Sequence, residues 1–284
     1  MRRRMLITLT FVMIGVGLIA YPQISKRIYD SKMTSQTVDY TRKISQTEKD
    51  KLKKEWQKAV EYNQNLVGKP TRDPFIPNSG MTYPDTYLQV LNYPDETMAI
   101  IEIPKIAVHL PVYHGTNESV LQKGVGHMEG TSLPIGGKGT HSVLTGHTGL
   151  AHSKIFTDLS ELAIDDLFYI HVLDKVLAYR IDQIKVVKPD KLDDLNLDAK
   201  KDYTTLITCT PYGVNSHRLL VRGVRTEYIP AEKEKIQPVT KKTEADRILE
   251  KAVIITSGIM LFLILLTYVL KKYSTKRNAE INKS

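Results

Sequence analysis

Two long apolar runs, one near each end of the chain, constrain its fold more than any other feature. Met5–Tyr21 and Ala252–Leu270 hold no charged residue over 17 and 19 positions. At about 1.5 Å per helical residue they would span roughly 26 to 28 Å, close to the thickness of a bilayer's hydrocarbon core. The sequence therefore predicts a transmembrane helix at each end and a polar region between them.

Each apolar run has a competing interpretation. A cleaved signal peptide also begins with a basic stretch and an apolar run, but Leu18–Pro22 lacks the small-x-small pattern of a cleavage site. The second run could be a buried core helix, but Lys251 and Lys271 flank it directly. We therefore interpret both runs as membrane anchors.

The distribution of charge agrees with a membrane protein. The chain has 40 Lys and Arg against 31 Asp and Glu, and residues 1–22 and 271–284 carry +7 of the net charge of +9. A nucleic-acid-binding protein needs basic residues spread over a folded surface, so we expect no nucleic acid as partner. Basic flanks favour the cytoplasmic side, which predicts both termini in the cytoplasm and residues 23–250 outside the cell membrane.

The region between the runs changes character along its length. Residues 34–65 are polar with Leu52, Trp56 and Val60 four positions apart, which predicts an amphipathic helix. Residues 67–82 are rich in Pro and Gly and predict a loop. Short strand-like runs then recur between turns, which is typical of a β-sandwich or a barrel. These runs are Ala99–Ile103, His141–Leu144, Leu167–Val172, Val176–Ile181, Thr204–Thr210 and Arg218–Arg225.

Cys209 is the only cysteine of the chain. Thiols outside the cytoplasm tend to form disulfides, and this one has no partner in its own chain. A free Cys can pack like a small apolar residue. Cys209, however, ends a β-branched run just before a turn, where a side chain more readily faces a cleft than a core. We interpret it as a reactive thiol.

An arginine follows on the next predicted strand. If the turn Pro211–Ser216 joins a hairpin that pairs Thr210 with His217, then Cys209 lies directly opposite Arg218, with Cβ atoms about 5 Å apart. A guanidinium there could reach a thiolate or an oxyanion. The register is an assumption, because a slip of one residue would move Arg218 to the other face. Arg222 lies farther from the turn, and we interpret it as a solvated charge.

Thiol chemistry also needs a proton carrier. His147 stands between Gly146 and Gly149 in a turn after a strand and is the first candidate, with His127 and His217 as alternatives. No His or Cys pair has the spacing of metal ligands, so we expect no metal. The glycines within residues 130–139 superficially resemble a phosphate loop but do not fit GxxxxGK[ST].

Two segments resemble the sortase family. Thr205–Leu219 is similar to the signature around the sortase cysteine, and Thr140–His147 is similar to the sortase histidine segment. The order His, Cys, Arg also agrees, over roughly residues 99–225. Two further features resemble the pilus-assembling class C branch, namely the C-terminal apolar run and Asp73-Pro74-Phe75, which is similar to that branch's lid motif. On composition alone, Asp73–Phe75 would be a plain linker.

The resemblance implies a mainly β fold, a closed barrel of about eight strands with short helices, an N-terminal helical extension and a transmembrane helix at each end. The expected segments are an N-terminal tip and anchor (1–22), a helical extension (23–66), a lid loop and connection (67–98), the catalytic barrel (99–228), a helical linker (229–251), a transmembrane helix (252–270) and a basic cytoplasmic tail (271–284).

The resemblance also implies an activity, that of a membrane-held cysteine transpeptidase of a Gram-positive surface. Such an enzyme cleaves an LPXTG-like sorting signal between Thr and Gly, holds the acyl group as a thioester and passes it to an amine, in class C a pilin lysine. Cys209 would be the nucleophile, His147 the general acid and base, and Arg218 the stabiliser of the oxyanion, while Asp73, Pro74 and Phe75 would form a lid. No cofactor is expected.

Three alternatives stay open at this point. A related sortase would attach surface proteins to the peptidoglycan precursor instead of polymerising pilins. A secreted cysteine protease would use the same side chains but deliver the acyl group to water. A non-enzymatic surface scaffold anchored in the membrane would carry Cys209 incidentally.

Overall fold

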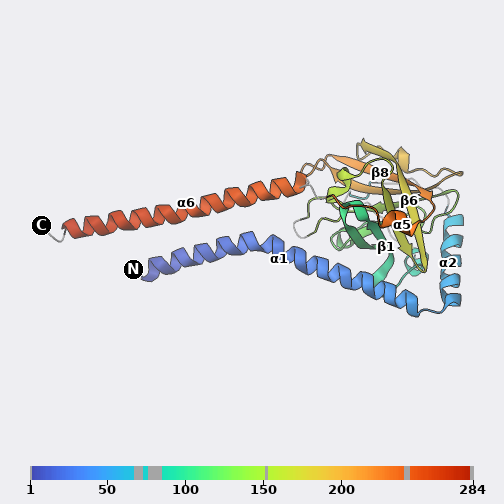
Figure 1. Cartoon of the computed structure of the whole chain (residues 1–284), viewed down its shortest axis with the longest axis horizontal. Coiled ribbons are helices and arrows are strands. Elements are labelled where there is room, and N and C mark those ends of the chain that lie inside the picture. Colours follow the sequence, from blue (N-terminus) through green and yellow to red (C-terminus); the bar gives the residue numbers. More distant parts are fainter. Residues whose placement is uncertain (1, 67–72, 76–84, 151–152, 240–243, 282–284) are drawn as a thin grey trace. The chain divides into compact units, whose positions relative to one another are not determined.

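The computed structural model of the chain describes all residues except 1, 67–72, 76–84, 151–152, 240–243 and 282–284. It divides into two units, Ile28–Lys241 and a second unit made of Met1–Arg27 and Lys242–Ser284. Figure 1 labels the main elements. The helices are α1 (Arg2–Gln46), α2 (Lys49–Gln64), α3 (Asp85–Gln89), α4 (Glu118–Leu121), α5 (Pro230–Lys233) and α6 (Glu244–Ile281).

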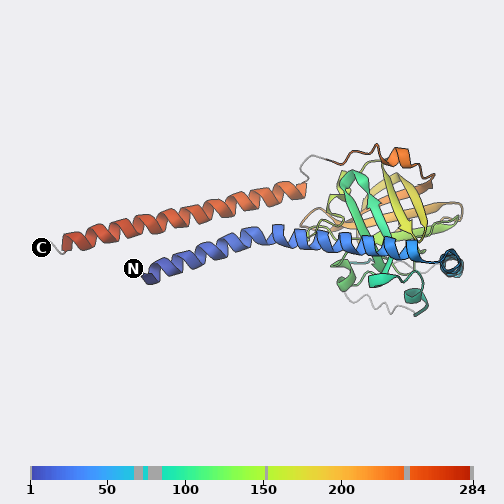
Figure 2. The same ribbon diagram turned by 60° about the horizontal axis from the view of Figure 1, so that its bottom comes forward.

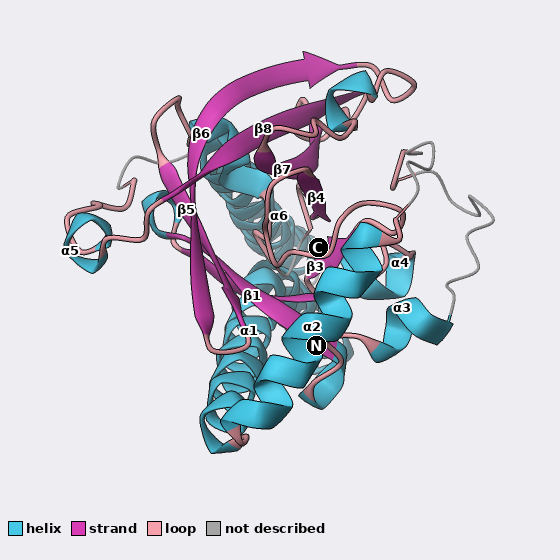
Figure 3. Ribbon diagram, turned by 90° about the vertical axis from the view of Figure 1, so that its right-hand side faces the viewer, coloured by secondary structure: helices cyan, strands magenta, loops and turns pink. Residues whose placement is uncertain are grey.

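Eight strands of the first unit close into a barrel in the order β1-β2-β3-β4-β7-β8-β6-β5. Figure 3 shows them with α2 in front. They are β1 (Thr97–Ile103), β2 (Val108–His114), β3 (Val125–His127), β4 (Thr140–Thr145), β5 (Leu167–Val172), β6 (Lys175–Val187), β7 (Asp202–Thr210) and β8 (His217–Thr226). The predicted mainly β closed barrel with an N-terminal helix is confirmed.

The six runs predicted as strands correspond to β1, β4, β5, β6, β7 and β8. The sequence did not reveal β2 and β3. Pro111 lies inside β2, and proline normally argues against a paired strand. Strand β3 is only three residues long and contains Gly126, so it has no detectable alternation. Both become strands because the barrel closes through them, with β2 paired to β1 and parallel to β3.

The helices next to the barrel pack onto it through apolar side chains. In the first unit, α1 contributes buried Met33, Tyr40 and Ile44 to the main core, and Figure 2 shows this part of α1 running across the strands. The Tyr40 hydroxyl accepts a hydrogen bond from the Leu173 N–H at 2.9 Å, which ties α1 to the turn between β5 and β6. On α2, the four-residue spacing places Leu52 in the same core, with Trp56 and Val60 packed against it.

One helix in the described part of the chain is long and apolar enough to cross a membrane. It is the stretch Glu250–Leu270 of α6, with a mean hydropathy of 2.6. This agrees with the predicted C-terminal span. The other predicted span, Met5–Tyr21, lies within α1 and stays a prediction, as does the orientation of both ends.

Candidate active site

The hairpin of β7 and β8 brings Cys209 and Arg218 together. The two strands pair with Thr210 opposite His217 and Cys209 opposite Arg218, which confirms the assumed register. The turn between them uses two residues with positive φ, Gly213 at +75° and Asn215 at +59°. Glycine adopts this region without strain and asparagine tolerates it better than most residues, so the turn chemistry sets the register. Neighbours across an antiparallel pair share a face, so the guanidinium lies beside the thiol.

His147 reaches the same end of the barrel through the neighbouring strand. Strand β4 runs parallel to β7 with Thr145 paired to Ile207, so His147 and Cys209 each lie two residues beyond one matched pair. Two hydrogen bonds continue the pairing: Gly146 N–H donates to the Ile207 carbonyl at 3.0 Å, and the Thr208 hydroxyl donates to the Gly146 carbonyl at 2.8 Å. A β-carbon at residue 146 would lie 2.7 Å from the Ile155 side chain, which explains the glycine before His147.

The other two candidate histidines have different positions. His127 is fully buried, and its ring nitrogens contact the Tyr87 hydroxyl at 2.9 Å and the Ser132 carbonyl at 2.8 Å. Burial lowers the pKa of His127 to about 4, so it is a neutral core residue. His217 pairs with Thr210, and because side chains alternate along a strand, it faces away from Cys209.

The thiol of Cys209 is buried, with 8% of its surface exposed. Burial raises the pKa of Cys209 to about 11, since the thiolate loses its hydration; Arg218 acts in the opposite direction, and Asp73 raises the pKa further. Only a small fraction of Cys209 is therefore thiolate near neutral pH. Arg218, which favours the thiolate, is already paired with a carboxylate.

That carboxylate is Asp73, which forms a two-point ion pair with Arg218. The guanidinium donates from Nε to Oδ1 at 2.9 Å and from Nη2 to Oδ2 at 2.6 Å, and the two side chains are only 8% and 1% exposed. Bidentate carboxylate–guanidinium pairs are among the strongest charge-assisted contacts in proteins. The third nitrogen of Arg218, Nη1, donates to the carbonyls of Asn215 and His217, both at 3.1 Å.

The Phe75 ring lies against His147 and Arg218. Its ring centroid lies 5.6 Å from that of His147, and the guanidinium carbon of Arg218 lies 5.0 Å from its centre. The Phe75 N–H donates to Asp73 Oδ1 at 3.3 Å, which holds the two residues in one turn with Pro74 between them. The ring also packs against a small apolar cluster formed by Met128, Val143, Leu192, Leu195, Ile207 and Leu220. The remainder of the predicted loop, residues 67–72 and 76–84, lies outside the described residues.

Glu118, a residue that the sequence reading did not single out, lies near His147. Its Oε2 is 3.4 Å from His147 Nε2 without forming a hydrogen bond, and the Glu118 side chain is 70% exposed. Glu118 is the first residue of α4, which is capped by Asn117. An Asn cap followed by an acidic residue signals a helix start but gives no hint of the histidine, because residues 118 and 147 meet only in the folded barrel.

The arrangement matches a known family. A model of the sortase domain matches residues 101–226. Sortase A from Bacillus anthracis is 31% identical over 123 residues, which cover 43% of this chain and 57% of that relative's own length. The crystal structure of sortase C-1 from Streptococcus pneumoniae is 43% identical, with a TM-score of 0.65 over 69% of this chain and all of that one.

A third similar protein, described as a pilus-related sortase C of Group B Streptococcus, is 40% identical, with a TM-score of 0.63 over 68% of this chain and 97% of that one. The chain belongs to the sortase family, and its structural neighbours are class C sortases.

Proposed function

We propose that this chain is a membrane-anchored cysteine transpeptidase that cleaves an LPXTG-like sorting signal between Thr and Gly and joins the new acyl end to a pilin lysine. The observation that carries the proposal is the pairing of Cys209 with Arg218 at the strand ends where His147 also lies. Membership of the sortase family and the pilus-related neighbour support the substrate class.

The proposed reaction uses three side chains in two acyl transfers. The Cys209 thiolate attacks the Thr carbonyl carbon, and Arg218 donates hydrogen bonds to the resulting oxyanion. As the C–N bond breaks, imidazolium of His147 protonates the departing Gly amine, which leaves a thioester on Cys209. A lysine amine then attacks the thioester, His147 accepts its proton, and the Cys209 sulfur departs as the new amide forms. Covalent catalysis divides the amide exchange in this way without ATP.

Arg218 and His147 have separate roles in this scheme for a physical reason. A guanidinium stays protonated at every accessible pH, so Arg218 cannot accept a proton and acts only as a donor. An imidazole changes its charge near neutral pH and can both donate and accept.

The proposal includes a lid made of Asp73, Pro74 and Phe75. Asp73 occupies two of the guanidinium's donor positions, and Phe75 rests on His147 and on the apolar cluster beside it. A substrate carbonyl cannot use Arg218 in the proposed way while Asp73 holds both positions, so the lid must leave before acylation. Replacing Asp73 and Phe75 together with Ala should make Cys209 react faster with a thiol reagent. Equal labelling rates of the double variant and the parent would contradict the lid.

The decisive experiment separates transpeptidase, protease and scaffold. The full chain in detergent micelles is incubated with an LPXTG-containing peptide, with and without a lysine-bearing acceptor peptide, and the products are identified by mass spectrometry. An acceptor adduct supports the proposal, hydrolysis alone indicates a protease, and no cleavage indicates a scaffold. The Asp73 and Phe75 double variant is run in parallel, because a closed lid would otherwise hide all three outcomes.

A further inference from the structure

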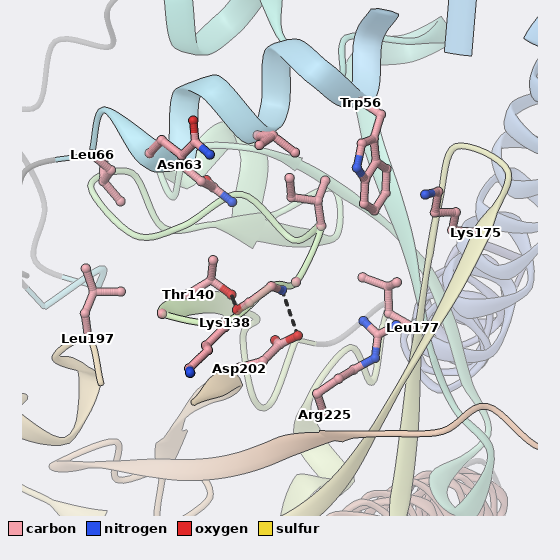
Figure 4. A pocket seen from close by; sticks show the side chains of 16 residues that line it. Trp56, Asn63, Leu66, Lys138, Thr140, Lys175, Leu177, Leu197, Asp202 and Arg225 are labelled. Atoms are coloured by element: carbon pink, nitrogen blue, oxygen red, sulfur yellow. Dashed lines mark hydrogen bonds between the residues drawn. The ribbon is translucent and has the colours of Figure 1, made fainter. Parts of the chain in front are cut away.

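A cavity lies at the end of the barrel opposite Cys209. Its volume is about 770 Å³, within the range of small-ligand sites. Thr140 and Asp202, which line it, are the first residues of β4 and β7. His147 comes two residues after the end of β4, and Cys209 is the next-to-last residue of β7. The cavity is bounded by α2, by the glycine-rich turn at residues 136–139 and by the end of β8 (Figure 4).

One wall of the cavity is apolar. Trp56 and Val60 belong to α2 and Leu177 to β6, while Leu197 lies across the cavity from them in Figure 4. Lys175 Nζ lies 3.9 Å from the centre of the Trp56 ring, a cation–π contact that places an ammonium at the edge of this wall. A ligand in the cavity would therefore meet apolar surface and positive charge side by side.

Among the described residues of the lining, the charged ones are three cations and one carboxylate: Lys138, Lys175, Arg225 and Asp202. Asp202 is already engaged, since it accepts hydrogen bonds from Gly137 N–H at 2.7 Å and from the Tyr179 hydroxyl at 3.1 Å. Within the described part of the chain, no carboxylate pairs with the guanidinium of Arg225, whose carbon lies 5.6 Å from the centre of the Tyr179 ring.

A glycine lets the backbone pass close to this guanidinium. Gly136 has a φ of +66°, and a β-carbon there would lie 2.8 Å from both Arg225 Nη1 and Asp202 Oδ2. The backbone thus approaches the two charged groups closely without a side chain between them. The glycine-rich turn that superficially resembles a phosphate loop instead supplies one side of this cavity, with Lys138 at its rim.

We propose that this cavity binds a carboxylate joined to an apolar group, as found at the C-terminus of a peptide with an apolar last residue or at an acidic side chain beside apolar residues. Arg225 would hold the carboxylate, with Lys138 and Lys175 adding positive potential, and the Trp56 wall would cover the apolar part. Asp202 partly offsets the three cations, which favours a single negative charge over a doubly charged phosphate.

Trp56 is the only tryptophan of the chain and lines this cavity, so tryptophan fluorescence comes from a residue of the proposed site. The full chain in detergent micelles is titrated with N-acetylleucine and with N-acetylleucinamide, which share one apolar body and differ in the carboxylate. We expect a saturable fluorescence change with the acid and at least about tenfold weaker binding of the amide. Equal affinities would overturn the proposal, and so would tighter binding of hexyl phosphate than of the acid.

Two short peptides then distinguish the source of the carboxylate. One carries a free C-terminal leucine, and the other carries an internal Glu-Leu pair with an amidated C-terminus. Saturable binding of either peptide supports the proposal and identifies its source, whereas binding of neither overturns it.

Matched variants test the role of Arg225. Arg225→Gln should weaken N-acetylleucine binding by about tenfold, with partial recovery in Arg225→Lys. Lys54→Gln removes a charge from an exposed position of α2 that does not line the cavity, and it should leave the affinity unchanged. An equal loss in Arg225→Gln and Lys54→Gln would contradict the proposal. Thermal melting of each variant checks its folding. None of these measurements depends on the thiol chemistry. A negative result would therefore overturn the binding site without bearing on the proposed transpeptidase activity.

Discussion

The two ends of β8 carry arginines in different environments. At one end Arg218 is buried against Asp73, a residue 145 positions away in the chain that occupies two of its donor groups. At the other end Arg225 lines an open cavity beside Asp202, whose carboxylate is held by a backbone N–H and a tyrosine. An arginine and an aspartate therefore form a closed site at one end and an open one at the other. The difference is that Asp73 is bound by the arginine itself, whereas Asp202 is bound by a backbone N–H and a tyrosine hydroxyl.

Under the proposed function the closed end is the reactive one. A free guanidinium next to a buried thiol would stabilise the thiolate, and Asp73 opposes this effect while it is bound. The described lining of the open end contains no cysteine. Changes at the closed end should therefore affect chemistry, and changes at the open end should affect binding.

The largest effect is expected from removing the thiol itself. Cys209→Ala should abolish the acceptor adduct, a loss of at least about 10³-fold, because no other side chain can form the thioester. Mass spectrometry of the peptide reaction measures it, with melting temperature as a check on folding. An adduct that persists in this variant would place the reactive centre elsewhere and break the comparison.

The next effect tests whether Arg218 differs from another arginine on the same strand. Arg218→Lys should lower the rate of adduct formation by about 10²-fold, because an ammonium cannot reproduce the fork of donors facing the oxyanion. Arg222→Lys is the matched control: Arg222 forms a similar two-point pair with Asp182, away from the thiol, and its change should alter the rate less than about twofold. Equal losses in the two variants would contradict a special role for Arg218.

A smaller effect concerns the pH dependence of the thiol. With a pKa of about 11, Cys209 of the parent should be labelled about tenfold faster for each pH unit between 7 and 10, since only the thiolate reacts. Asp73→Asn removes the carboxylate that raises this pKa and leaves Arg218 unpaired, so the pKa should fall. Labelling at pH 8 should rise by about tenfold.

The control for this measurement is Asp182→Asn. It breaks the ion pair of Arg222, which lies on the same strand as Arg218, and it should leave the labelling profile unchanged. A profile that moves equally in both variants would mean that general loosening of the barrel, rather than the lid, exposes the thiol.

The smallest effect belongs to the open end. Asp202→Asn removes a negative charge near the proposed carboxylate site and should tighten N-acetylleucine binding by about threefold, as expected for one screened charge several ångströms away. Trp56 fluorescence measures this change. Weaker binding in the variant would contradict this expectation and indicate that Asp202 acts mainly by holding the glycine-rich turn through Gly137.

How much of the site could be anticipated depended on how far apart its parts lie in the chain. Cys209 and Arg218 are nine residues apart across a turn, and local turn chemistry was enough to align them. The glycines around His147 marked it as the first candidate, with His127 and His217 as alternatives, and the resemblance to sortases favoured it. Asp73 came from the resemblance alone, because its composition predicted a plain linker. Nothing in the sequence pattern suggested Glu118 beside His147 or Asp202 beside Arg225, because these neighbours come from separate elements of the barrel.

By itself the sequence determined the two apolar runs, six of the eight strands and the hairpin that sets the thiol beside an arginine, because these depend on composition, short-range periodicity and turn residues. Only the tertiary structure decided that β4 lies parallel to β7, that Asp73 covers Arg218 and that Arg225 faces a cavity. Parallel pairing and long-range ion pairs leave no periodic trace in a chain. They form because barrel closure brings distant segments together, and there the burial of apolar surface outweighs any local preference.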